Sequence, residues 1–299
     1  MKSFLSVLLA FGTFFSCQPK KDQATSSTAD TPQLAPLAYA LDRPTARYDL
    51  PKELKEISGL TYYQGTQLAG VQDERGDIYV FDYATGKVSD QLIFGPNGDY
   101  EGIEFVKGVF YVLRSDGQIF IVRPGEDTFK AGGIIDNGSR QLQTLTIGLP
   151  EKTDVEGLGY DPKTDRLLIA IKDMKGEAKK RFVYFYDFDK KVAWKGIALT
   201  PAKLEQEAGL TGKAADLKPS GVAVHPKTGE FYLLASDGKK LLVLDRMGII
   251  RSVAQLDPGD FRQPEGICFA PDGTLFIASE GKGDKGYILK FDYQTPTNP

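Results

Sequence analysis

One short pattern occurs five times along the chain and constrains its fold more than any other feature. Each copy consists of a variable residue, Glu or Ser, Gly, an aliphatic residue, a variable residue, and an aromatic or aliphatic residue. The five invariant glycines are Gly59, Gly102, Gly157, Gly221 and Gly266. Their spacings are 43, 55, 64 and 45 residues. Self-similarity at this period indicates a repeat architecture in which each copy is one supersecondary unit.

The residues after each glycine predict three short strands per repeat. Pro, Gly and Asp turns, such as His225-Pro-Lys-Thr-Gly and Ala270-Pro-Asp-Gly, follow the first strand. The pattern predicts an all-β, five-bladed β-propeller, with a hidden sixth blade as the alternative. The last repeat has room for only three strands, so we expect an N-terminal strand from residues 45–51 to complete that blade and close the ring. Residues 201–215 predict a helical surface insertion.

The first 16 residues have the form of a secretion signal. Lys2 precedes an apolar run from Phe4 to Phe15, which is too short to span a bilayer comfortably. The run ends at Ser16-Cys17, and a small residue followed by Cys resembles a bacterial lipoprotein signal. We therefore expect cleavage before Cys17 and lipidation of its thiol, with an ordinary secretory signal as the alternative.

A polar segment rich in Ser, Thr and Pro follows the signal and has the composition of a flexible tether. The expected organisation is a signal peptide at 1–16, a lipidated Cys and tether at 17–38, and a single β-propeller domain at 39–299. The expected location is the bacterial cell envelope, on the periplasmic side or the cell surface. The membrane is then a partner through the N-terminal lipid.

Charge and motifs exclude several classes of function. The net charge is −3, so nucleic-acid binding has no electrostatic support. His225 is the only histidine, which excludes a two-His metal site and the HExxH motif. The sequence contains no Gly-x-Ser-x-Gly elbow, Walker loop or EF-hand loop. We assign no catalytic residue.

The repeat gathers carboxylates at one mouth of the central channel, because the first strand of a blade starts on the face where the second strand ends. The strand starts supply Ser58, Glu101, Glu156, Ser220 and Glu265. The expected ligand site at the mouth comprises Asp73, Glu74, Glu101, Arg114, Asp116, Glu156, Asp173, Asp237, Glu265 and Glu280. Like charges this close need a cation, basic partners or raised pKa values.

Three interpretations of these carboxylates stay open. Hard oxygen ligands suit Ca²⁺, and the candidate ligands are Glu101, Glu156 and Glu265, with Asp99 and Asp154 beside them. Alternatively, interleaved basic residues form salt bridges that tie the blades together; these are Arg75, Arg114, Lys172, Lys239 and Lys282. A catalytic acid–base pair is the third interpretation.

Several strings in succession resemble the SdiA-regulated, YjiK-like β-propeller family over residues 45–293. They are Glu56-Ile-Ser-Gly-Leu-Thr-Tyr, Gly70-Val-Gln-Asp-Glu-Arg-Gly and Asp99-Tyr-Glu-Gly-Ile-Glu-Phe. The resemblance implies a secreted or envelope-anchored propeller with links to calcium-responsive and phytase-like propellers. The phytase link implies a Ca²⁺ cluster with Lys and Arg directed at phosphate. This chain departs from that pattern, since Ser58 and Ser220 replace two of the five inner carboxylates.

The expected function is a binding or interaction module of the envelope, with Ca²⁺ as the possible cofactor at the acidic mouth. Its partner would be an envelope protein or a small ligand. One alternative is a Ca²⁺-dependent hydrolase of phosphate esters or lactones. Another is a structural or assembly module at the cell surface.

Overall fold

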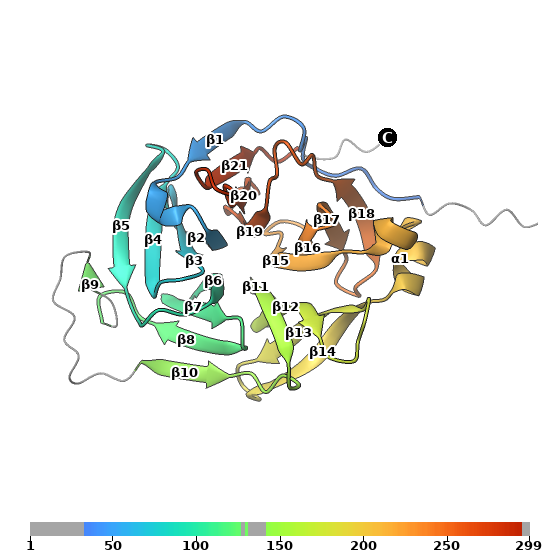
Figure 1. Ribbon diagram of the computed structural model, residues 1–299, viewed down its shortest axis with the longest axis horizontal. Helices are drawn as coiled ribbons and strands as arrows, with labels where there is room; N and C mark the ends of the chain where they lie inside the picture. The colour runs from blue at the N-terminus through green and yellow to red at the C-terminus, as the bar shows by residue number, and fades with distance from the viewer. Residues whose placement is uncertain (1–32, 127–128, 131–141, 295–299) are drawn as a thin grey trace, which may run out of the picture. The chain divides into compact units, whose positions relative to one another are not determined.

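Each of the five repeats forms one antiparallel sheet, and the sheets stand in a ring around a central axis (Figure 1). The structure is a computed structural model and describes residues 33–126, 129–130 and 142–294. The prediction of an all-β, five-bladed propeller is confirmed. The predicted signal peptide, the lipidated Cys17 and the tether up to residue 32 lie outside the described residues.

The first two blades follow the repeats from the innermost strand outward. The first contains β2 (Ile57–Gln64), β3 (Gln67–Gln72), β4 (Asp77–Asp82) and β5 (Lys87–Ile93). The second contains β6 (Tyr100–Val106), β7 (Val109–Arg114), β8 (Gln118–Val122) and β10 (Gln143–Thr146). Between β8 and β10 the chain returns to the first blade, where β9 (Phe129–Lys130) pairs with β5 as an extra edge strand.

The third and fourth blades are separated by the predicted insertion. The third contains β11 (Thr153–Asp161), β12 (Arg166–Met174), β13 (Arg181–Asp187) and β14 (Val192–Leu199). The fourth contains β15 (Lys218–Val224), β16 (Phe231–Asp237), β17 (Lys240–Leu244) and β18 (Ile250–Gln255). The insertion forms helix α1 (Pro201–Ala208) and the 3₁₀ turn η2 (Gly212–Ala215). Thr200 caps α1 by accepting a 3.1 Å hydrogen bond from the Lys203 amide.

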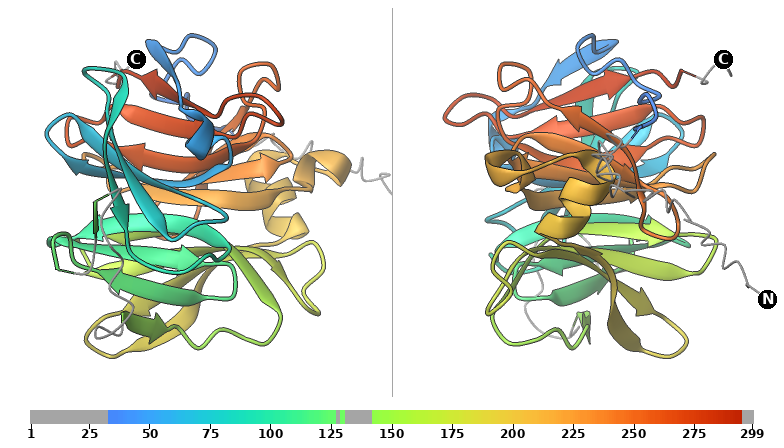
Figure 2. Two further views of the ribbon diagram at one scale, coloured as in Figure 1. Left: turned by 60° about the vertical axis from the view of Figure 1, so that its left-hand side comes forward. Right: turned by 90° about the vertical axis from the view of Figure 1, so that its right-hand side faces the viewer.

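The fifth blade joins the two ends of the domain. It contains β19 (Pro264–Phe269), β20 (Leu275–Ser279), β21 (Tyr287–Phe291) and β1 (Ala46–Asp49). The β1 strand pairs antiparallel with β21, with Ala46 opposite Lys290 and Asp49 opposite Tyr287. This confirms the predicted closure, and η1 (Lys52–Leu54) then leads into β2. Figure 2 shows β1 lying beside β21 from the side.

Apolar side chains fill the spaces between neighbouring blades. Leu113 and Ile119 of the second blade pack with Leu158 and Ile169 of the third in one buried cluster. Cys268 is buried in a comparable cluster between the first and last blades. Because every blade buries both of its faces, the central strands are nearly continuous apolar runs apart from their ends.

The segment before β1 packs against the fourth and fifth blades. The Ala35 amide donates a 2.8 Å hydrogen bond to the Arg251 carbonyl. The Tyr39 hydroxyl donates a 2.6 Å bond to the Gly273 carbonyl and lies 2.9 Å from His225 Nε2. Burial lowers the pKa of His225 to about 4. His225 is therefore a neutral packing residue, and residues 33–38, which the sequence placed in the tether, lie on the propeller. Within the described ranges, no helix is long and apolar enough to cross a bilayer.

Candidate functional site at the channel mouth

The repeat glycines allow the five inner strands to approach one another closely. A Cβ atom on Gly157 would lie 2.8 Å from the Gly221 Cα, and one on Gly102 would lie 2.9 Å from the Leu158 amide nitrogen. The space enclosed by the inner strands is correspondingly narrow, at about 10 Å³. That volume is close to the minimum for one water molecule, so a larger ligand would have to bind at the mouth.

Strand register places the predicted residues on one face of the ring. Tyr100, which precedes Glu101, lies opposite Arg114. Asp154 lies opposite Asp173, and Lys218 lies opposite Asp237. The starts of the inner strands and the ends of the second strands therefore meet at the same mouth, as the repeat geometry predicts.

Three glutamates of this mouth form what we call the glutamate ring: Glu101, Glu156 and Glu265. Glu156 and Glu265 are only 6% and 8% exposed. Burial, with the charges of Glu156, Asp99 and Glu265, raises the pKa of Glu101 to about 9. Burial, with the charge of Glu156, raises the pKa of Glu265 to about 8. The ring is thus a site where ionised carboxylates are costly without a counter-charge.

Glu156 is the ring member that has a basic partner. The Lys172 ammonium donates a hydrogen bond to Glu156 Oε1. Burial still raises the pKa of Glu156 to about 7, against the lowering effect of Lys172. Among the residues that the structure describes, neither Glu101 nor Glu265 forms a salt bridge.

The two serines of the repeat have a structural role. Ser58 Oγ donates a 2.5 Å hydrogen bond to the Tyr100 carbonyl, immediately before Glu101. Ser220 Oγ donates a 2.7 Å bond to the Pro264 carbonyl, immediately before Glu265. Each serine therefore ties its inner strand to the next one around the ring. The ring contains three carboxylates instead of five because two positions serve this contact.

A second acidic group lies beside the ring, between the first and fifth blades. Burial, with the charges of Glu56 and Glu74, raises the pKa of Asp73 to about 6. Burial, with the charges of Asp73 and Glu56, raises the pKa of Glu280 to about 7. Asp73 Oδ1 is buried and has no hydrogen-bond partner in the described ranges. Sequence reasoning did not assign Glu56 to the site, although Glu56 directly precedes the first repeat.

The remaining predicted mouth residues are paired locally or exposed. Arg114 forms a bidentate pair with Asp116, with hydrogen bonds of 3.0 and 2.7 Å. Asp237 lies 3.9 Å from Lys218 and is largely exposed. Glu74 and Asp173 are exposed. Arg75 pairs with Asp77 at 3.0 Å. These two arginines therefore neutralise carboxylates of their own turns and not those of the glutamate ring.

Glu104 is a further carboxylate that the sequence analysis did not single out. It accepts a 2.6 Å hydrogen bond from Thr61 Oγ1, and burial raises its pKa to about 7. Both residues lie two positions after a repeat glycine, deeper along the inner strands. This shared repeat position could have identified the pair from the sequence, because it places the two side chains on neighbouring inner strands.

The mouth is rich in oxygen ligands for a metal ion. The donor set is chemically suited to a hard cation, and the orphaned Asp73 oxygen is an unused ligand atom. Nevertheless, the described part of the chain holds no group of three His, Cys, Asp or Glu side chains arranged to bind a metal ion. A Ca²⁺ ion would therefore require carboxylate side chains to move together, and the Ca²⁺ site stays a prediction.

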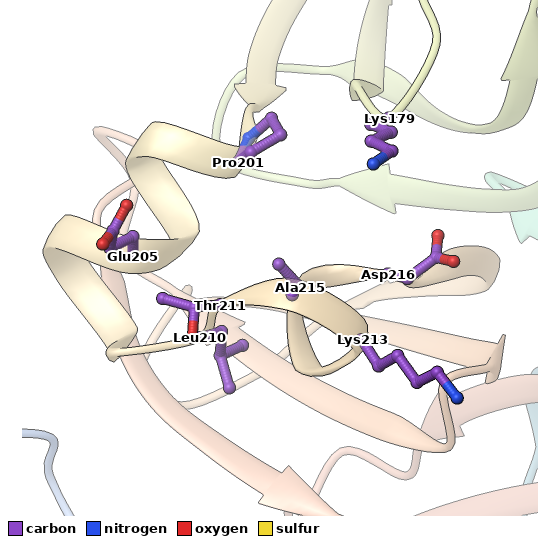
Figure 3. Close-up of a pocket in the computed structure, with 9 residues that line it drawn as sticks. Lys179, Pro201, Glu205, Leu210, Thr211, Lys213, Ala215 and Asp216 are labelled. Carbon is purple, nitrogen blue, oxygen red and sulfur yellow. The ribbon is translucent and has the colours of Figure 1, made fainter.

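One cavity adjoins the mouth, and another lies against the insertion. One, of about 140 Å³, shares Glu156 and Glu265 with the glutamate ring. The other, of about 390 Å³, lies against the insertion. Figure 3 shows that Glu205 lines it from α1, whereas Lys179 and Asp216 line it from outside that helix. A Cβ atom on Gly238 would lie 2.5 Å from the Asp216 carbonyl, so the insertion abuts the β16–β17 turn at the mouth.

Comparisons with known proteins agree with this architecture. The family model described as SdiA-regulated matches residues 46–282. No curated protein matches the chain significantly. The crystal structure of Myxococcus xanthus glutaminyl cyclase is similar with a TM-score of 0.55 and 13% identity, covering 85% of this chain and 97% of that one. The PQQ-bound aldose sugar dehydrogenase from Streptomyces coelicolor has a TM-score of 0.46 and 16% identity, covering 84% and 99%. The similarity to the glutaminyl cyclase structure shows the fold alone.

Proposed function

The chain belongs to the SdiA-regulated family, and on that premise we propose that it is a ligand-binding module of the cell envelope. In this proposal a lipid on Cys17 anchors the propeller to the membrane, and the ligand binds at the channel mouth. The partner is a small ligand or a segment of an envelope protein that reaches this face.

The observation that supports the proposal is that the glutamate ring has fewer basic partners than carboxylates. Three carboxylates converge on a narrow channel, and Lys172 forms its salt bridge with Glu156. Keeping the half-buried Glu101 and the buried Glu265 without a salt-bridge partner opposes folding unless they stay protonated or a bound cation neutralises them. Uncompensated carboxylates at an accessible mouth are typical of a binding site rather than of a packing arrangement.

Ca²⁺ is the cation that we propose for the glutamate ring and the adjacent Asp73. Carboxylate oxygens are its preferred ligands, and Asp73 supplies an oxygen that no described group satisfies. Bound Ca²⁺ would supply positive charge to the ring and would hold Glu101 and Glu265 in their ionised forms.

Thermal melts of the full chain in detergent test this proposal. Wild type is melted with EDTA and then with millimolar Ca²⁺, beside a Glu101→Gln/Glu265→Gln variant. A ligand present at 100 times its Kd stabilises the native state by about 2.7 kcal/mol. For a domain of this size we expect a Tm rise of roughly 5–10 °C. The rise should disappear in the double variant and persist in Glu205→Gln, a control on the exposed helix. No rise in wild type would contradict the cation site.

The second candidate is a Ca²⁺-dependent hydrolase of phosphate esters or lactones. One observation favours it: four lysines line the 140 Å³ cavity that also contains Glu156 and Glu265. Ca²⁺ there would polarise an ester oxygen or activate water. A panel of phosphate esters and lactones with excess Ca²⁺ tests this function. Turnover that Glu101→Gln/Glu265→Gln abolishes would support it, and absence of turnover would leave binding as the better explanation.

A further inference from the structure

We propose that the 140 Å³ cavity beside the glutamate ring binds an oxyanion, the phosphate or carboxylate group of a small ligand, between Lys239 and Lys282. This inference deepens the proposed function by naming the class of ligand, and it rests on that function. We call the cavity the lysine pocket; its lining residues are Glu156, Lys172, Lys218, Ser236, Asp237, Lys239, Gln263, Glu265 and Lys282.

The size of the lysine pocket limits what it can hold. Its volume is about 140 Å³. Pockets for drug-sized ligands enclose roughly 300–1,000 Å³. The lysine pocket therefore accommodates a small anion or the charged end of a longer molecule whose remainder extends over the mouth.

The two key lysines come from equivalent positions in neighbouring blades. Lys239 follows Ala235-Ser-Asp-Gly, and Lys282 follows Ala278-Ser-Glu-Gly. Their φ angles are +48° and +47°, so the two turns have the same left-handed backbone conformation at the lysine. The repeat thus presents two copies of one turn to the same cavity, and two ammonium groups can approach one anion from different blades.

The charges of the lysine pocket do not balance. Lys172 is paired with Glu156, and Lys218 lies 3.9 Å from Asp237. Lys239 Nζ donates a 3.0 Å hydrogen bond to the Ser236 carbonyl, which is a neutral acceptor. This leaves Lys239 without a carboxylate partner in the described part of the pocket.

Lys282, whose side chain is exposed, is the second lysine of the pocket without a contacting carboxylate among the described residues. Within the described ranges its ammonium forms no hydrogen bond or salt bridge. Glu280 interacts with it only through space, and Asp73 and Glu56 act on the same carboxylate. Burial, and then the positive charge of Lys282, lower the pKa of Lys239. Two cations that repel each other across a polar cavity form a binding site for an anion.

Neutral polar side chains also line the lysine pocket. Ser236 and Gln263 interact with Glu265 and line the same cavity. Their hydroxyl and amide groups are neutral donors that can complete the coordination of an oxyanion.

Lysine suits this ligand class. Its ammonium is a compact point charge with three rotatable donors, whereas arginine imposes a planar bidentate geometry. Two lysines therefore accept either a tetrahedral phosphate or a planar carboxylate. The shared chemistry is an oxyanion, and the experiment separates the two sources.

The test is isothermal titration calorimetry of the full chain in detergent at pH 7 and fixed ionic strength. Inorganic phosphate is the probe in one arm, malonate in a second, and KCl in a third. We expect phosphate or malonate to bind saturably, and KCl to give no saturable signal. Whichever oxyanion binds more tightly identifies the source. The Lys239→Gln/Lys282→Gln variant should lose at least tenfold in affinity.

Two further variants control for charge and for folding. Lys179→Gln/Lys213→Gln, at the separate cavity of Figure 3, is the matched charge control and should bind normally. Lys239→Arg/Lys282→Arg retains both charges and should bind more tightly than the Gln variant, which guards against misfolding of the Gln variant. Saturable binding that both Gln double variants weaken equally would overturn the lysine pocket, and so would the absence of binding in wild type.

The inference and the proposed function fail in different ways. If neither oxyanion binds but Ca²⁺ still raises the Tm of wild type, the lysine pocket is wrong and the binding function stands. If neither oxyanion nor Ca²⁺ has an effect, both are wrong.

Discussion

Lys172 on β12 donates a hydrogen bond to Glu156 on the neighbouring β11, and this contact makes the glutamate ring asymmetric. Burial alone would lower the pKa of Lys172, but the hydrogen bond and charge of Glu156 outweigh it and raise that pKa. Glu101 and Glu265 are the members left for a ligand or a proton to neutralise. The asymmetry therefore separates a structural carboxylate from two candidate functional ones.

Lys172→Met is expected to destabilise the propeller by about 1–3 kcal/mol, because Glu156 remains buried without its partner. Chemical denaturation with urea at pH 7 measures this loss. Lys172→Met/Glu156→Gln should recover part of it, since the second change removes the unpaired carboxylate. Strict additivity of the two single losses would show that the pair is not coupled.

Gly157→Ala is expected to cost more than about 2 kcal/mol, since its Cβ would lie 2.8 Å from the Gly221 Cα on the adjacent inner strand. A backbone neighbour cannot rotate away, so the two blades must separate. Gly95→Ala is the matched control, because its nearest atoms lie at 3.5 Å and belong to side chains. Urea melts that gave the two variants equal stability would contradict tight contact between inner strands.

Ser220→Ala is expected to cost about 1–2 kcal/mol by removing the buried 2.7 Å hydrogen bond to the Pro264 carbonyl. Ser89→Ala, at an exposed residue, removes a part-buried 3.3 Å bond to the Val80 carbonyl and a 3.2 Å bond accepted from Gln67, and should change stability by less than about 0.5 kcal/mol. Comparison of their urea midpoints checks whether Ser220 ties the fourth blade to the fifth. A Ser220→Ala midpoint equal to that of wild type would refute this role.

The repeat predicted most of the fold because one glycine per blade must sit at the same crowded position. That requirement recurs in Gly59 through Gly266, so the inner strands and their common face followed from spacing alone. The completion of the fifth blade by β1 followed from counting strands after Gly266. The β9 strand was missed because two residues without an apolar pattern form an edge pair only through the position of β5.

The sequence predicted which face of the ring carries the site residues better than it predicted which side chains pair with one another. Spacing places Arg114 and Glu101 at one mouth, but the bidentate pair of Arg114 with Asp116 depends on side-chain rotamers within one turn. Lys218 was not assigned to the site because it precedes the repeat pattern, and only the register opposite Asp237 brings it to the lysine pocket. Sequence spacing specifies a backbone position, whereas charge pairing depends on where long side chains turn.

Stability is expected to fall as pH rises from 7 to 9 in EDTA. The native pKa values of Glu101 and Glu265 are about 9 and about 8, above the ordinary value of 4.5 that applies to the unfolded chain. The native state therefore binds more protons than the unfolded state across this window, and the free energy of unfolding decreases with pH. Each titrating group contributes at most about 1.4 kcal/mol per pH unit.

Glu104 and Glu280, whose pKa values burial raises to about 7, also lose protons in the lower part of this window, so comparison with Glu101→Gln assigns the fall to the glutamate ring. Below pH 6.5 the lowered pKa of His225 acts in the opposite direction, since protonation favours the unfolded chain. At more alkaline pH the lowered pKa values of Lys239 and Lys240, which burial causes, also act in the opposite direction. Glu101→Gln should flatten the fall in Tm, which we expect to reach several degrees in wild type at roughly 2–4 °C per kcal/mol. A Tm that stayed constant or rose from pH 7 to 9 in metal-free wild type would mean that Glu101 and Glu265 are already neutralised within the protein.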